Sequence, residues 1–132
     1  MTGFCVSFAA RHPFRDLSNL LTPLGVVPNH CWQAGDQRRT PTGVILEGSY
    51  DFSYSSCDLP LPASDDLAAW LVQAVDFLRP VSKQLISFVD DGGSLCFYIG
   101  LEKGVFEGAT LAPRLLAELG EFRISLDIDR EI

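Results

Sequence analysis

The residues best suited to chemistry in this 132-residue chain lie between Trp32 and Arg39. Trp32 offers a flat aromatic surface, and Gly35 lets a turn backbone come close to a ligand. Asp36 adds a carboxylate, while Arg38 and Arg39 carry planar guanidinium groups that bind carboxylate or phosphate. These residue types predict a recognition patch. A simpler interpretation is that Trp32 closes the end of the core and Asp36 accepts hydrogen bonds within a turn.

The pair His30 and Cys31 suggests a nucleophile with its base, or two metal ligands. Neighbours on an extended chain point to opposite faces, however, so they cannot easily share one reacting atom. Adding His12 would require tertiary contact that the sequence does not predict. We therefore expect no catalytic residues, no metal and no cofactor.

The remaining thiols and carboxylates have ordinary structural explanations. The four cysteines are Cys5, Cys31, Cys57 and Cys96, and their scattered positions, without C-x-x-C spacing, favour reduced thiols. Cys5 and Cys96 fall in strand-like segments, where we expect the thiol to be buried. The carboxylates of Glu121, Asp127 and Asp129 would share one face of the last strand, where they could hold a cation or act as acid and base. A solvated sheet face explains them as well, and residues 90–93 read as a polar turn.

Composition limits the class of protein. With 47% hydrophobic and 20% charged residues, residues 1–132 fit one domain with a real core. The net charge of −7 disfavours nucleic acid and acidic membrane surfaces as partners. No segment predicts a membrane span or a secretion signal, which favours a cytoplasmic protein.

The charge is uneven along the chain. Residues 1–46 hold four arginines against two aspartates, whereas residues 47–132 hold six basic and fifteen acidic groups. This distribution predicts two faces of opposite sign.

Hydrophobic periodicity predicts the elements that would position these groups. The first half reads as a strand from Phe4 to Arg11, an amphipathic helix over 14–24, a short strand over 30–33, and a strand over 44–54 with a bulge at Gly48. The second half reads as a helix capped by Ser64, a helix opened by Pro80, a strand over 95–101, a helix capped by Thr110, and a strand over 122–128.

Several of these strands are apolar on one side and polar on the other, which indicates a sheet with helices on one face only. The predicted fold is α+β: a two-layer sandwich with a mostly antiparallel sheet. Its element order matches a ferredoxin-like core with an added helix and strand.

The chain combines a strand ending in Arg11, a leucine helix, Leu24-Gly25-x-x-Pro28, Trp32-x-x-Gly35-Asp36 and a terminal Leu126-Asp127-Ile128. On these features it resembles an uncharacterised bacterial family, domain of unknown function 4279. The similarity covers nearly the whole chain. It implies a fold more than an activity.

The interpretation we favour is a non-enzymatic protein-binding domain, an immunity-type or regulatory inhibitor of a basic partner, because acidic surfaces accelerate capture of basic proteins. Its contact surface would be the uncovered sheet face, where Arg11 and Tyr98 could lie together. The alternative is a small-ligand-binding protein or an enzyme that uses the Trp32 to Arg39 loop. Pairing between sheet edges would make a homodimer, and the sequence leaves that open.

Overall fold

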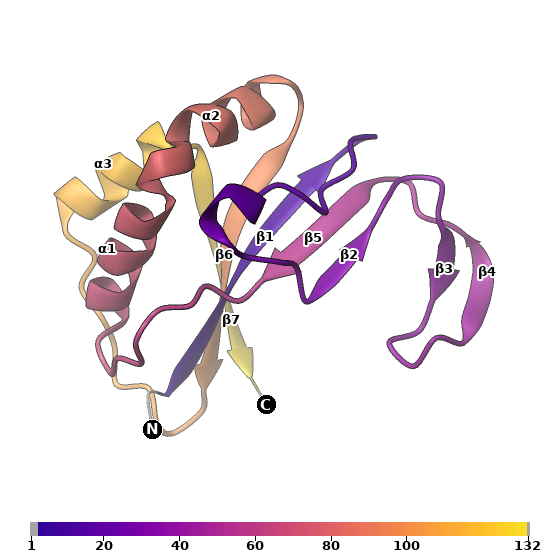
Figure 1. The fold of residues 1–132 in the computed structure, drawn as a ribbon. Helices are drawn as coiled ribbons and strands as arrows, with labels where there is room; N and C mark the ends of the chain where they lie inside the picture. The colour runs from indigo at the N-terminus through magenta and orange to yellow at the C-terminus, as the bar shows by residue number, and fades with distance from the viewer. Residues whose placement is uncertain (1–2, 132) are drawn as a thin grey trace.

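The structure has two layers, a five-stranded sheet and a set of helices that cover one of its faces (Figure 1). The computed structural model describes residues 3–131. The sheet is built from β1 (Phe4–His12), β2 (His30–Trp32), β5 (Ser53–Cys57), β6 (Ser94–Glu102) and β7 (Ile124–Glu131). The second layer contains α1 (Leu67–Leu78), α2 (Ser82–Asp90) and α3 (Pro113–Glu121), with a 3-10 turn η2 (Arg79–Val81) between α1 and α2.

The strand order is β2-β5-β1-β6-β7, with every neighbouring pair antiparallel except β6 and β7. The first four of these strands have the order of a ferredoxin-like sheet. The segment α3–β7 then adds one helix and one strand parallel to β6. The predicted two-layer α+β fold with a mostly antiparallel sheet is confirmed.

One face of the sheet packs against the helices and the other meets solvent. Along β1, Phe8 and Ala10 are buried on the helix side, while Cys5 and Arg11 are exposed on the opposite side. The same alternation holds along β6, where Phe97 is buried and Tyr98 is exposed. The predicted open face is present, and Cys5 lies on it, so the expected burial of that thiol was wrong.

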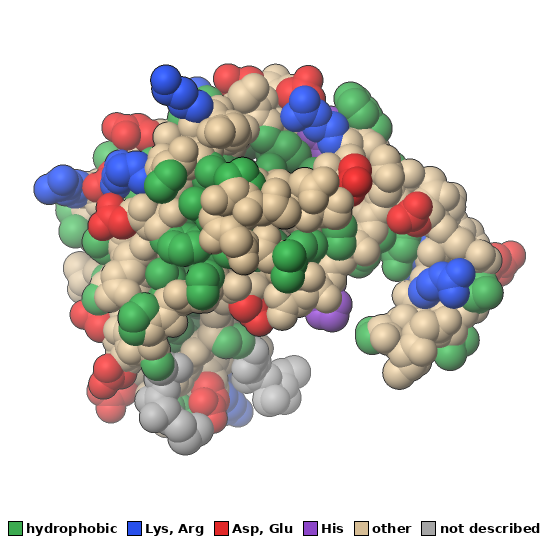
Figure 2. Space-filling view, viewed as in Figure 1, with side chains coloured by type: hydrophobic (Ala, Val, Ile, Leu, Met, Phe, Trp, Pro, Cys, Tyr) green, Lys and Arg blue, Asp and Glu red, His purple; other side chains and the backbone are tan. Residues whose placement is uncertain are grey.

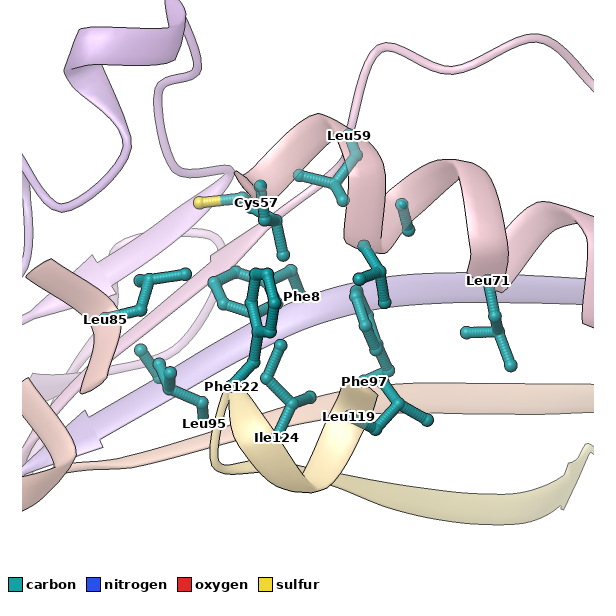
Figure 3. Packing of buried hydrophobic residues seen from close by; sticks show 14 of the residues in the cluster. Phe8, Cys57, Leu59, Leu71, Leu85, Leu95, Phe97, Leu119, Phe122 and Ile124 are labelled. Carbon is teal, nitrogen blue, oxygen red and sulfur yellow. The ribbon is translucent and has the colours of Figure 1, made fainter. Parts of the chain in front are cut away.

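Large apolar side chains fill the space between the layers (Figure 3). The ring centroid of Phe97 lies 5.4 Å from that of Phe8 and 6.2 Å from that of Trp70 on α1. Gly93 is needed at the end of α2, because a side chain there would meet the Phe88 ring at 2.4 Å. Close packing of this kind fixes the helices on the sheet.

The helix starts differ from those predicted. The carboxylate of Asp66, not Ser64, caps α1 by accepting the N–H of Ala69 at 3.2 Å. The Ser64 hydroxyl instead accepts the N–H of Asp66. Helix α3 begins at Pro113, beyond Thr110, because proline is favoured in the first turn, where no N–H partner is needed.

The predicted helix over residues 14–24 was wrong, and the segment holds only a short 3-10 turn, η1 (Thr22–Leu24). Its leucines still reach the core, since Leu17 and Leu21 are buried. Local polar groups hold the backbone in turns instead: the Asp16 carboxylate accepts the N–H of Ser18, and the Thr22 hydroxyl donates to a nearby carbonyl. Such bonds compete with helix formation, and the ferredoxin-like core therefore lacks its first helix.

The predicted strand over 44–54 was also wrong in one respect, because it divides into β4 (Ile45–Ser49) and β5. β4 pairs with β3 (Gln37–Arg39) in a separate two-stranded sheet, which we call the arm, residues 37–49. The pairing shifts register along β4, and Gly48 there has φ 89°, in keeping with the predicted bulge. The arm projects from the edge of the main sheet next to β2 (Figure 1).

Candidate recognition site

The arm is joined to the main sheet by an aromatic stack centred on Trp32. Its ring lies 4.2 Å from Tyr50 at 13° and 4.6 Å from Tyr54 at 25°, both stacked. Its indole N–H donates to the Phe52 carbonyl at 3.0 Å. Trp32 therefore closes the end of the sheet, as the simpler interpretation expected, and it also forms part of the base of the arm.

A hydrogen-bonded turn completes the joint. The Asp36 carboxylate accepts the N–H of Gln33 at 2.9 Å. The N–H of Tyr50 donates to the Asp36 carbonyl at 2.9 Å, and the N–H of Gly35 donates to the Tyr50 carbonyl at 2.8 Å. Gly35 has φ 90°, a conformation that other residues rarely adopt. Gly35 and Asp36 thus act mainly as turn residues.

Between β2 and the arm lies a cleft of about 720 Å³. Figure 2 shows the hollow that separates the arm from the rest of the molecule. Its lining combines aromatic, charged and backbone groups from both sides: Asn29, His30, Cys31, Trp32, Asp36, Gln37, Arg39, Thr40, Pro41 and Tyr50. A cleft of this size and mixed lining suits an extended peptide or a small polar ligand.

The structure brings only some of the predicted site residues into this cleft. Trp32, Asp36 and Arg39 line it. Arg38 follows the alternation of the strand and lies beside Gly48, outside the cleft. The predicted pair of guanidinium groups is therefore divided between two sides of the arm.

Arg11 belongs to a different surface. Its guanidinium lies over Phe52, 5.0 Å from the ring centroid, and 5.6 Å from that of Tyr54. It lines a hollow of about 290 Å³ on the open sheet face together with Tyr98 and Asp127. Arg11 and Tyr98 thus share one surface, as the sequence suggested.

His12 has a structural role. It is buried, and its Nδ1 accepts the N–H groups of Phe14 at 3.2 Å and Arg15 at 3.0 Å. Its Nε2 lies 3.2 Å from the Asp91 carboxylate, which also pairs with Arg15. Both ring nitrogens are therefore engaged, which leaves neither for a metal ion. The turn at residues 90–93 supports this histidine through Asp91.

The thiols do not favour nucleophilic chemistry. Burial, followed by the nearby carboxylates of Asp16 and Asp36, raises the pKa of Cys31. Burial is also the main cause that raises the pKa of Cys57, to about 11, and that of Cys96. A raised pKa reduces the thiolate, which is the reactive form.

The acidic groups of the last strand do not assemble as predicted. Glu121 ends α3 and does not share a strand face with Asp127 and Asp129, which lie exposed on β7. Among the side chains of residues 3–130 there is no group of three or more His, Cys, Asp or Glu arranged to hold a metal ion. The Tyr98 hydroxyl donates to Asp129 at 3.0 Å.

The arginines of the first 46 residues do not form one positive face. Arg15 pairs with Asp91 at 3.2 Å, and Arg11 lies over aromatic rings. Arg38 and Arg39 are on β3. These arginines therefore lie at separate places in the fold, so the uneven charge along the chain does not gather them on one face.

Sequence reasoning missed the exposed apolar residues of the arm. Val44 is 60% and Ile45 56% exposed, and every residue of β4 is exposed. The sequence predicts both residues within one strand over 44–54 of the main sheet. The turn residues Pro41 and Gly43 just before them were a signal for a hairpin that could have separated this segment from the core.

Comparison with family models, with curated proteins and with solved structures finds no match to this chain. Across the part of the chain that the structure describes, no helix has both the length and the apolar character needed to cross a membrane.

Proposed function

We propose that this chain is a non-enzymatic protein-binding domain, of the immunity or regulatory type, whose partner is a basic protein. The observation that carries the proposal is the arm. Its strand β4 is exposed along its whole length, and it presents Ile45 and Leu46 to solvent, as does Val44 just before it. Apolar side chains held away from the core contribute little to folding, and exposed apolar groups gathered on one projecting element favour a contact role.

The charge of the chain supports a basic partner. The net charge of −7 creates a field that accelerates encounter with a positively charged protein and weakens with added salt. The arm would then supply the apolar contacts that hold the complex. The raised pKa values of the cysteines, described above, argue against catalysis by a thiol.

The experiment is affinity capture from the native host at low salt, with matched variants. Val44→Ser with Ile45→Ser removes two exposed apolar groups from the arm. Val72→Ser with Leu116→Ser removes two similarly exposed groups from helices α1 and α3. The wild type and the helix variant should retain the same basic protein, and the arm variant should lose it. Equal capture by all three chains, or no partner at all, would contradict the proposal.

A second candidate is small-ligand binding or enzymatic activity in the cleft, supported by the Trp32–Tyr50 stack beside Arg39. Ligand binding to the folded chain raises its melting temperature, so a thermal-shift screen of metabolites and metal ions tests it. Arg39→Ala should abolish such a shift, and Arg38→Ala, outside the cleft, should leave it unchanged. A flat response across the library argues for the protein-binding proposal.

We further propose that the chain is a cytoplasmic bacterial protein and a divergent member of the family domain of unknown function 4279. The motif residues Trp32, Gly35 and Asp36 support this, because they build the joint of the arm, a role that would constrain their types. Sequences of related bacterial chains that keep these residues but lack an arm after them would speak against membership.

A further inference from the structure

The outer edge of β7 is the longest free edge of the main sheet. β7 spans eight residues and neighbours only β6, whereas the opposite edge strand, β2, spans three. Within residues 3–131 no further strand pairs with the outer side of β7. An edge strand presents backbone N–H and C=O groups that can bind an extended segment of another chain.

The side of β7 on the open sheet face is acidic. Asp127 and Asp129 are both exposed there, two residues apart on one strand. Among the described residues, no basic side chain lies within ion-pair distance of either carboxylate. Asp129 instead accepts hydrogen bonds from the Tyr98 hydroxyl and, at 2.8 Å, from the N–H of Arg130. Among residues 3–130, these two carboxylates therefore have no ion-pair partner.

The other side of β7 is apolar from Ile124 to Ile128 and ends at the exposed Arg130. Ile124 is buried beneath the helices, whereas Ile128 is 53% exposed. Ile99, the neighbour of Ile128 on β6, is fully buried. A side chain from a strand added at the edge would cover Ile128 on this side. The edge therefore alternates between an acidic and an apolar face with the period of a strand.

A second copy of the chain does not suit this edge. Directly opposite residues of an antiparallel pair lie on the same face of the sheet. In a two-fold pairing of β7 with itself, the aspartates of one copy would therefore face the aspartates of the other. Like charges opposite each other are destabilising, so the occupant must carry the opposite charge.

We propose that the outer edge of β7 binds an extended segment of a partner protein in which basic residues alternate with apolar ones. The basic residues lie opposite Asp127 and Asp129, and an apolar residue covers Ile128. The segment adds a sixth strand to the sheet. This deepens the proposed function, because it states which part of a basic partner is recognised at the edge opposite the arm.

The test uses synthetic peptides and backbone amide NMR of the full chain. The probe is acetyl-Lys-Val-Lys-Val-Lys-Val-amide. Its control is the isomer acetyl-Lys-Lys-Val-Val-Lys-Val-amide, which has the same charge and composition but no two lysines two residues apart, so only one lysine at a time can lie opposite an aspartate. The alternating peptide should bind up to about fivefold more tightly, since its second cross-strand charge pair contributes up to about 1 kcal/mol. Its amide shifts should centre on residues 124–129. Equal binding of the isomers, or shifts elsewhere, would overturn the proposal.

A charge reversal on β7 gives a second, independent test. Asp127→Lys with Asp129→Lys should transfer the preference to acetyl-Glu-Val-Glu-Val-Glu-Val-amide. Asp65→Lys with Glu107→Lys makes the same change in net charge at exposed sites away from β7 and should keep the preference for the basic peptide. If both variants change preference equally, the charge acts at long range and the proposal fails.

Should the lysine variant at β7 lose its dispersed amide spectrum, Asp127→Asn with Asp129→Asn replaces it, and the alternating basic peptide should then lose its advantage over the isomer. The peptide test does not depend on the arm. Loss of the peptide preference with capture through the arm intact would reject only the β7 proposal, and the reverse result would reject only the proposed function.

Discussion

The main two-layer body and the arm both contain large apolar side chains, which are buried in the body and exposed in the arm. In the body, Phe97 and Leu71 are completely buried between sheet and helices. In the arm, Val44 and Ile45 are more than half exposed, because the two-stranded sheet has no helix layer to cover it. The comparison shows that apolar character alone does not place a side chain in a core: a second layer must be present.

Residues from both sides form the joint between the body and the arm. Trp32 comes from the main sheet, and its stacking partner Tyr50 follows the last residues of the arm. Paired backbone bonds between residues 35–36 and Tyr50 hold the base of the arm closed. The arm is therefore held in place at its base while its far end contacts little of the body.

The largest expected effect is in the body. Phe97→Ala should lower the free energy of unfolding by about 3–5 kcal/mol, because it removes a buried ring that contacts Phe8 and Trp70. Urea denaturation followed by circular dichroism measures it. A loss below about 1 kcal/mol would mean that the body is packed no better than the arm.

His12→Ala should have the next largest effect, a loss of about 2–3 kcal/mol. The change leaves the N–H groups of Phe14 and Arg15 without their acceptor and opens a space in the core. Asp91→Ala is the control: it removes the partly exposed carboxylate that Nε2 shares with Arg15, leaves the acceptor at Nδ1 in place and should cost less. An equal loss in the two variants would assign the stabilisation to the contacts of Asp91 instead.

Trp32→Leu should affect the joint, with a loss of about 1–2 kcal/mol, because two stacked aromatic pairs and one hydrogen bond disappear. Hydrogen exchange should become faster in residues 37–49 and stay unchanged in β6. Faster exchange throughout the sheet would show that the arm and the body open as one unit.

The smallest effect is expected in the arm itself. Ile45→Ser should change the free energy of unfolding by less than about 0.5 kcal/mol, since the side chain is already largely in solvent. Denaturation under the conditions used for Phe97→Ala gives the comparison directly. A loss near that of the core variant would contradict the separation of the two regions.

The sequence predicted the body better than the arm. Helices α1 and α2 and strands β1, β6 and β7 follow periodicities of 3.6 or 2 residues, since each has one buried side, and their positions were predicted within a few residues. The segment over 14–24 shows helical spacing yet is irregular, because side-chain to backbone bonds near Asp16 and Asn19 outweigh the periodicity.

The candidate site was predicted only in part. Trp32, Asp36 and Arg39 do line one cleft, but the distance of Arg11 from it and the outward position of Arg38 depend on tertiary arrangement. The exposed position of Ile45 could not follow from its type, because alternation along residues 44–54 is the same for a core strand and for a projecting hairpin.

The most direct test of the account is removal of the arm. Asp36 and Tyr50 already form a paired position, so an Asn-Gly turn can replace residues 37–49 and close the chain. The measurement is the affinity of this shortened chain for the basic protein captured by the wild type, with unfolding checked alongside. We predict a cooperative unfolding transition within about 1 kcal/mol of the wild type and at least a hundredfold loss of affinity, about 2.7 kcal/mol. Undiminished affinity in a folded chain without the arm would contradict the proposal that the arm binds the partner.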